Sequence, residues 1–151
     1  MITRFWHFSF TVSDLERSLE FYCGALGMKR LHRQDQANEY TRKLVGYPDA
    51  DLRVAFVGFE DPPALYLELI QYRAPLLPPH PPGTAFPNSA HLAFQTDDAP
   101  AEYERLQALG VRFRSEPIAI AAGINRGGYT MYFLDPDGIT LELFQPPKAQ
   151  P

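Results

Sequence analysis

Residues 141–145 read LELFQ and residues 67–71 read LELIQ, so one short segment occurs twice in a chain of 151 residues. In both copies a glutamate, Glu142 or Glu68, stands between leucines in a segment with the composition of a strand. An unpaired carboxylate on a buried face costs several kcal/mol, so its charge must be compensated if these strand faces are buried.

The start of each half of the chain is repeated as well. Residues 7–14 read HFSFTVSD and residues 91–98 read HLAFQTDD, and both are followed by apolar residues at helical spacing. These matches indicate an internal duplication of one strand–helix–strands unit. Each unit begins with a histidine, His7 or His91, and ends with one of the two glutamates.

The pattern of apolar residues and turn residues predicts the strands. We expect strands over residues 4–12, 51–59, 64–72 and 90–96, a strand over 111–121 interrupted at Pro117, and a hairpin over 129–145 that turns at 135–138. Residues 60–63, which read EDPP, are expected to form the turn between two of these strands.

Two helices are predicted, one in each unit. In the first, over residues 14–28, Ser13 and Glu16 have capping-box spacing, and Gly24 or Gly27 ends the helix. The second follows Asp97 or Asp98 as its cap and ends at Gly110.

The chain is expected to form one domain made of two modules. Residues 73–89 contain six of the fifteen prolines, so we expect an extended linker there, with His80 as a linker residue. The expected boundaries are module one over 1–72, the linker over 73–89, module two over 90–146 and a tail over 147–151.

Composition excludes several classes of function. The net charge is −4 with no basic excess, so we expect no nucleic-acid partner. No apolar run approaches the roughly 20 residues of a membrane span, and the N-terminal residues do not read as a signal peptide. The single Cys23 excludes an internal disulfide and fits a cytoplasmic location. Any metal must therefore be held by nitrogen and oxygen atoms.

The repeated residues form a candidate metal-ligand set of two imidazoles and two carboxylates: His7, Glu68, His91 and Glu142. A divalent cation would neutralise the buried carboxylates, and the four side chains would satisfy the cation. A lone strand histidine is usually structural, but equivalent His and Glu residues in two repeats favour a metal site. His32 has no counterpart in the second unit and is expected at the surface.

Two longer segments resemble the signatures of a known family. Residues 7–28, HFSFTVSDLERSLEFYCGALGM, and residues 132–143, YFLDPDGITLEL, are similar to the two signatures of the vicinal oxygen chelate superfamily. This superfamily includes glyoxalase I, methylmalonyl-CoA epimerase, extradiol dioxygenases and fosfomycin or bleomycin resistance proteins. The resemblance covers nearly the whole chain and implies an α+β fold of two tandem βαβββ modules forming a half-barrel around one metal.

The resemblance implies that His7, Glu68, His91 and Glu142 bind one divalent metal ion, which could be Zn, Ni, Co, Mn or Fe. In this branch of the family the metal polarises a carbonyl of a small oxygen-rich substrate while a neighbouring C–H loses its proton. Glu142 or Glu68 is the implied base. The expected function is therefore that of an isomerase, epimerase or lyase, and a homodimer is expected.

The branches of the superfamily differ in how well their characteristic residues match this chain. Short bacterial glyoxalase I has an arginine where this chain has Thr11 and an asparagine where it has Tyr72, and those residues hold glutathione carboxylates. An extradiol Fe(II) dioxygenase would need only His7, His91 and Glu142, with Tyr132 at a matching position, but it leaves Glu68 unused. A metal-free binding or resistance protein is the third alternative, and such proteins typically lack the four ligands.

Strand alternation adds candidate substrate-binding residues beside the ligands. The residues on the ligand faces are Thr11, Tyr66, Ile70, Gln95 and Thr140. Arg126, in the loop GINRGG, could meet an anionic group of a substrate, and Tyr132 could line the cleft or pack.

Overall fold

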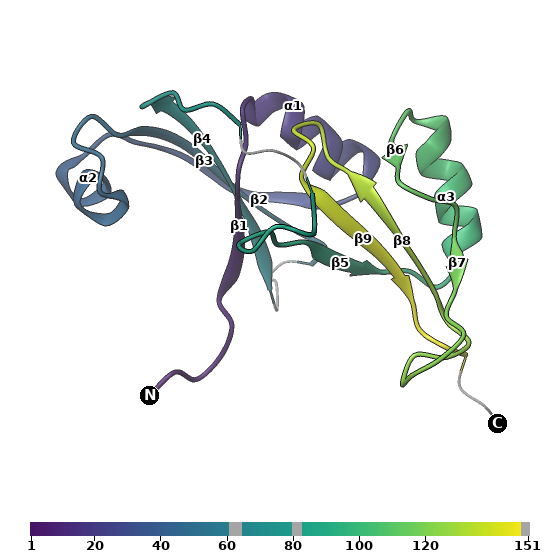
Figure 1. Ribbon diagram of the computed structural model, residues 1–151. Coiled ribbons are helices and arrows are strands. Elements are labelled where there is room, and N and C mark those ends of the chain that lie inside the picture. The colour runs from purple at the N-terminus through teal and green to yellow at the C-terminus, as the bar shows by residue number, and fades with distance from the viewer. Residues whose placement is uncertain (61–64, 80–82, 149–151) are drawn as a thin grey trace. The chain divides into compact units, whose positions relative to one another are not determined.

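The computed structural model describes residues 1–60, 65–79 and 83–148, and the chain divides into two compact units, Met1–Pro79 and His80–Pro151. Each unit holds one mixed sheet with a helix after its first strand (Figure 1). The expected α+β class and the two βαβββ modules are confirmed at this level.

In the first unit the strands lie in the order β1-β4-β3-β2. Its elements are β1 (His7–Thr11), α1 (Leu15–Leu19), the π-helix η1 (Glu20–Ala25), β2 (Lys29–Gln36), α2 (Glu39–Val45), β3 (Asp51–Gly58) and β4 (Tyr66–Ala74). The first strand of the unit pairs in parallel with the last, and the other neighbours are antiparallel.

The second unit repeats this order as β5-β9-β8-β6, with β7 also paired to β8. Its elements are β5 (Leu92–Gln95), α3 (Ala99–Ala108), β6 (Arg112–Phe113), β7 (Ile118–Ala119), β8 (Tyr129–Leu134) and β9 (Thr140–Gln145). Again the first strand pairs in parallel with the last. Ser9 lies opposite Glu68 in one unit, as Ala93 lies opposite Glu142 in the other, which confirms the internal duplication.

Strand alternation divides each sheet into a helix face and an open face. In the first unit α1 contacts β3 and β4, and the buried side chains of Leu15 and Leu19 meet a sheet face on which Leu67 and Leu69 are buried. Glu68 stands between these two leucines, so alternation directs its side chain to the opposite face. Leu67 and Leu69 of the LELIQ segment therefore belong to the core, and the side chain of Glu68 points away from it.

The first helix differs from the prediction at both ends. Asp14, and not Ser13, is the N-cap, because its side chain accepts a hydrogen bond from Arg17 N, whereas Ser13 Oγ accepts one from the Arg17 side chain. After Leu19 the helix widens into η1, with Leu26 as its C-cap and Gly27 beyond it at φ +74°. Gly27 therefore follows the end of the helix, as predicted, and Gly24 lies within it.

Other boundaries agree with the predictions or need small corrections. Asp98 caps α3, and Gly110 follows its C-cap at φ +81°. The linker begins later than predicted, because residues 73 and 74 belong to β4, while 75–79 and 83–90 form neither helix nor strand. Of the predicted EDPP turn only Glu60 is described, and His80 also lies outside the described residues.

Helix α2 was not predicted, although its capping is readable in the sequence. Asn38 accepts a hydrogen bond from Thr41 N, and Gly46 ends the helix at φ +78°. Among the described residues, no helix combines the length and apolar character needed to cross a membrane.

Candidate metal-binding site

The first unit brings His7 and Glu68 together on its open face. His7 lies opposite Tyr66, and Ser9 lies opposite Glu68, so the imidazole and the carboxylate are diagonal neighbours on adjacent strands. His7 Nε2 lies 3.3 Å from Glu68 Oε2. The side chains are 36% and 16% exposed, so both are partly accessible to solvent.

The second unit forms the equivalent pair from His91 and Glu142. His91 Nε2 lies 3.1 Å from Glu142 Oε2, and the side chains are 39% and 18% exposed. The other carboxylate oxygen, Oε1, accepts a hydrogen bond from Thr130 Oγ1 at 2.5 Å. Both oxygens of Glu142 are therefore held by neighbouring side chains.

The two pairs differ at one position. Thr130 lies opposite Phe144, two residues beyond Glu142, and the corresponding residue opposite Ile70 in the first unit is Val54. Valine has no hydroxyl group and cannot donate to Glu68. The duplication therefore places equivalent carboxylates in unequal surroundings.

The geometry of each pair fits two ligands of one cation. Ligands with bonds of about 2.1 Å to a Zn-like ion lie about 3.0–3.4 Å apart at octahedral to tetrahedral angles. The observed separations of 3.3 and 3.1 Å fall in this range. Imidazole nitrogen and carboxylate oxygen are also donors that first-row divalent metals accept.

The two pairs belong to different units of the chain. Within residues 1–60, 65–79 and 83–148, no group of three or more His, Cys, Asp or Glu side chains is placed to hold a metal ion. Each unit thus supplies half of the predicted ligand set, and the complete set of four stays a prediction.

The sequence model of the Glyoxalase/Bleomycin resistance protein/Dioxygenase superfamily matches residues 4–143, a range that contains both His–Glu pairs. The chain belongs to this superfamily. It is 35% identical to a 2-epi-5-epi-valiolone epimerase of Actinomyces sp. over 96% of this chain and 80% of that protein. It is 33% identical to a lactoylglutathione lyase of Neisseria meningitidis over 94% of this chain and 90% of that one. A glyoxalase family protein of Bacillus cereus shares the fold, with a TM-score of 0.83 at 17% identity over 97% of this chain and 96% of that one.

Two predicted neighbours of this glyoxalase-type site contact the ligand pairs. The ring of Tyr66 lies 5.5 Å from that of His7 with an interplanar angle of 30°. The ring of Tyr132 lies 5.1 Å from that of His91 in a T-shaped arrangement, and Tyr132 is opposite Glu142 in the sheet. Each histidine ring is therefore oriented by a tyrosine from the same sheet.

The other candidate substrate-binding residues differ in their exposure and in the face on which they lie. Thr11 lies opposite Ile70, which puts it on the face of Glu68, and Gln95 lies opposite Phe144, which puts it on the face of Glu142. Thr140 shares the latter face but is only 4% exposed and accepts a hydrogen bond from Arg114, so its expected place in an open cleft is wrong. Arg126 lies in an exposed loop, and its contact with substrate remains a prediction.

His32 lies on the open face of the first sheet, which the sequence did not reveal. It pairs with Phe56, which pairs with Glu68, and its ring stacks on Phe56 at 5.9 Å and 15°. A bulge between Arg30 and His32 breaks the alternation in β2. No strand was predicted over residues 29–36, so the sequence assigned His32 only to the surface, where it is indeed exposed.

Tyr72 follows Glu68 by four residues on the same open face. Burial raises the pKa of its phenol above the usual 10.0, and the nearby Tyr47 and Glu68 raise it further. The ring of Tyr47 meets that of Tyr72 edge-on at 6.1 Å. Tyr72 therefore remains a neutral phenol at physiological pH.

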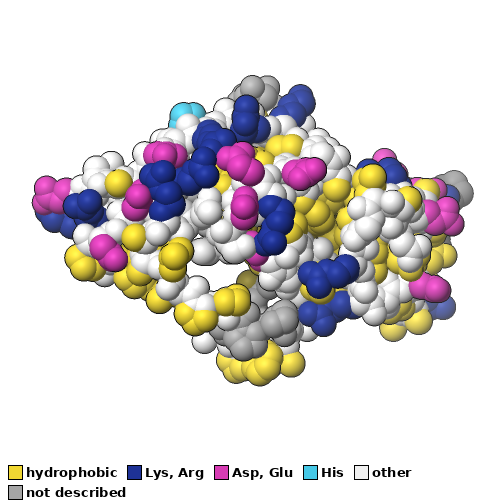
Figure 2. Space-filling view, turned by 90° about the horizontal axis from the view of Figure 1, so that it is seen from above, with side chains coloured by type: hydrophobic (Ala, Val, Ile, Leu, Met, Phe, Trp, Pro, Cys, Tyr) yellow, Lys and Arg dark blue, Asp and Glu magenta, His cyan; other side chains and the backbone are white. Residues whose placement is uncertain are grey.

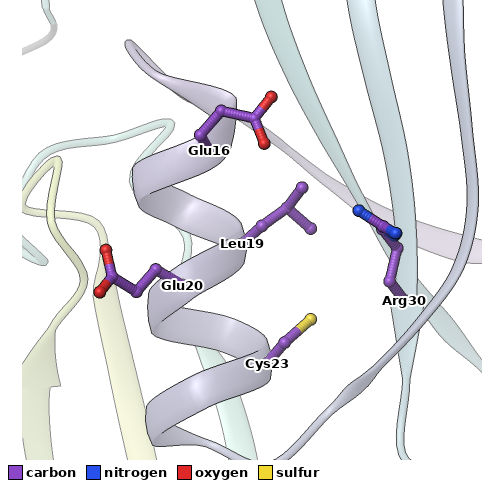
Figure 3. Close-up of a pocket in the computed structure, with 5 residues that line it drawn as sticks. All are labelled: Glu16, Leu19, Glu20, Cys23 and Arg30. Carbon is purple, nitrogen blue, oxygen red and sulfur yellow. The ribbon is translucent and has the colours of Figure 1, made fainter.

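A separate hollow lies beside the first helix, and none of the four pair residues lines it. Glu16, Leu19, Glu20, Cys23 and Arg30 line it (Figure 3). Glu16 is engaged by Arg33 at 2.5 Å and by Arg53 at 3.3 Å. Burial raises the pKa of the Cys23 thiol, with Arg30 opposing part of this effect, so the thiol is a weak nucleophile near neutral pH.

Charged side chains are mixed on the surface. Figure 2 shows Lys and Arg interspersed with Asp and Glu on the face in view, with no continuous basic field. Arg73, for example, forms salt bridges with both Asp51 and Asp35.

Proposed function

We propose that this chain is a divalent-metal-dependent isomerase, epimerase or lyase that removes a proton next to a chelated carbonyl group. The observation that carries the proposal is the duplicated His–Glu pair, whose donor atoms in each unit are spaced as two ligands of one cation. Relatives named as a lactoylglutathione lyase and as an epimerase support this class of reaction.

In this proposal His7, Glu68, His91 and Glu142 hold one divalent ion, and the protein acts as a homodimer. A bound divalent cation would supply the Lewis acidity that makes a C–H next to a carbonyl acidic. The tyrosines beside the two histidines, Tyr66 and Tyr132, restrict the ring orientations. Holding the donors in place before the substrate arrives lowers the cost of reorganisation during the reaction.

Glu68 is the better candidate for the base. Glu142 is held at one oxygen by Thr130 and at the other by His91, whereas Val54 occupies the position next to Glu68 that would supply the second contact. A carboxylate that must rotate to accept a proton should be held by fewer hydrogen bonds than one that only binds the metal. Glu142 then anchors, and Glu68 accepts the proton from the substrate carbon.

The metal content of purified, refilled protein tests the proposal. We expect about one divalent ion per chain, with a sharp loss in His7→Ala and in His91→Ala, measured by inductively coupled plasma mass spectrometry. His32→Ala is the matched control, because this imidazole lies on the same face but outside the pair. Unchanged metal content in both ligand variants would overturn the site.

A further inference from the structure

A row of aromatic rings crosses the open face of the first sheet. The ring of Tyr66 on β4 lies 5.5 Å from His7 on β1 and 5.1 Å from Phe56 on β3. Phe56 in turn lies 5.9 Å from His32 on β2. We name His7, Tyr66, Phe56 and His32 the aromatic row; it begins at the metal pair and extends away from it.

The aromatic row is not part of the hydrophobic core. Phe56 and Tyr66 are partly exposed and His32 is exposed, whereas the core rings of Tyr22 and Phe133 are completely buried. Aromatic rings gathered on an accessible face form an apolar surface of the kind that binds ligands.

The row is specific to the first unit and does not follow from the duplication. Tyr132 takes the place of Phe56 opposite Glu142, but Thr140 takes the place of Tyr66 in the second unit. Thr140 is buried, and Arg114, which directly follows β6 and whose backbone N–H bonds to Tyr132 O, stands at the position of His32. Both units therefore keep the ligand residues and an aromatic ring opposite the glutamate, whereas only the first unit extends these rings to a row of four.

Charged side chains of both signs lie around the row. Alternation places Arg33, Arg53 and Arg73 on the opposite face, where they pair with Glu16, Asp35 and Asp51. On the row's own face lie Glu68 and Lys29, the latter opposite Gly58, together with Gln34, whose Oε1 lies 3.3 Å from His32 Nε2.

We propose that the aromatic row binds the ring of a cyclic polyhydroxylated ketone whose adjacent oxygens reach the His7–Glu68 pair, an inference that rests on the proposed function. Tyr66 and Phe56 meet at 75°, so their faces form a corner. A puckered ring can place C–H groups against both walls of the corner, whereas a flat arene stacks on only one. Its hydroxyl groups would find Tyr66 OH, His32 and Gln34 as partners.

Binding of 2-keto-myo-inositol, measured by calorimetry with and without saturating Zn²⁺, tests the inference. Trp6 gives a second readout, because it is the single tryptophan and lies edge-on to Tyr66 at 6.0 Å. We expect the cyclic ketone to bind at least about tenfold more tightly than the acyclic dihydroxyacetone and to change the Trp6 emission. Equal affinities for the two ketones would overturn the proposal, and tighter binding of catechol would assign the row to a flat ring instead.

Variants connect the binding to the row. Phe56→Leu keeps an apolar side chain but removes the ring, and we expect about tenfold weaker binding of 2-keto-myo-inositol with unchanged metal content. Tyr40→Leu, an exposed aromatic on α2, is the matched control and should bind normally. If Phe56→Leu does not fold, His32→Leu at the exposed end of the row replaces it. Normal affinity for 2-keto-myo-inositol in the folded variants would refute binding by the aromatic row. Failure of the wild-type protein to bind a divalent metal would refute only the proposed metal site.

Discussion

Gln145 Oε1 accepts a hydrogen bond from the backbone N–H of Ala99 across 2.7 Å. Ala99 is the first residue of α3, where a backbone N–H has no partner within the helix. Gln71 Oε1 does the same for Leu15 N at 3.3 Å, at the start of α1. The glutamine that closes both copies of the LELxQ segment therefore fastens the last strand of each unit to the start of its helix.

Replacement of Gln145 by alanine should destabilise the protein by about 1–2 kcal/mol, because the buried N–H of Ala99 loses its acceptor. Gln71→Ala is the internal comparison and should cost less, because its two hydrogen bonds, with Leu15 N and Ser13 O, are longer and less buried. Urea denaturation followed by circular dichroism measures both. A larger loss in Gln71→Ala than in Gln145→Ala would contradict this ranking.

Thr130→Val should weaken retention of the divalent ion by about 10–100-fold, because Glu142 loses the hydrogen bond that orients it. Valine has nearly the same shape as threonine, so the change removes the hydroxyl and little else. Thr130→Ser keeps a hydroxyl and should behave like wild type. Competition with a chromophoric chelator gives the affinities, and equal values for the valine and serine variants would refute the role.

Glu68→Gln separates proton transfer from oxygen chemistry. If Glu68 is a ligand and the base, this variant should bind metal less tightly and exchange the substrate's acidic C–H with D2O about 10²–10⁴-fold more slowly. NMR follows the exchange. A dioxygenase using His7, His91 and Glu142 would instead tolerate the change, and Fe(II)-loaded Glu68→Gln would consume oxygen with catechol at the wild-type rate.

The methylglyoxal–glutathione hemithioacetal should be a poor substrate. Thr11 and Tyr72 stand where glutathione-specific enzymes have a cationic and an amide side chain, and the raised pKa of Tyr72 keeps it a neutral phenol. A missing charged partner costs on the order of 1–3 kcal/mol. Thr11→Arg combined with Tyr72→Asn should raise kcat/KM for the hemithioacetal, whereas efficient turnover by wild-type protein would contradict the prediction.

Alkylation of Cys23 should be slow below pH 9. Burial favours the neutral thiol and raises the pKa above 9.0, so the reactive thiolate forms at higher pH than in an exposed cysteine. Arg30→Gln removes the opposing positive charge and should move the pH profile further upward. Iodoacetamide labelling is specific because the chain has one cysteine, and a profile centred below pH 9 in wild type would contradict the assignment.

Much of the fold could be predicted because duplication supplied an internal comparison. The equivalence of His7 with His91, and of Glu68 with Glu142, was visible in the letters, and both pairs form in the structure. The sequence did not place His32 on this face, because β2 itself was not predicted and a bulge within it shifts the alternation. Thr140 was expected in an accessible cleft but is buried. Alternation predicts on which face of the sheet a side chain lies, but it does not predict whether other residues bury that side chain.

Duplication gave the two halves equivalent acids, and Val54 and Thr130 show how little is needed to make them unequal. A single hydroxyl group fastens one carboxylate and leaves its twin less restrained. In the proposed mechanism, a substitution beside the two glutamates thus gives them different roles, although neither glutamate itself has changed. Divergence among relatives with this ligand set should accordingly concentrate in the neighbours of the ligands, where chemistry can be reassigned without losing the centre.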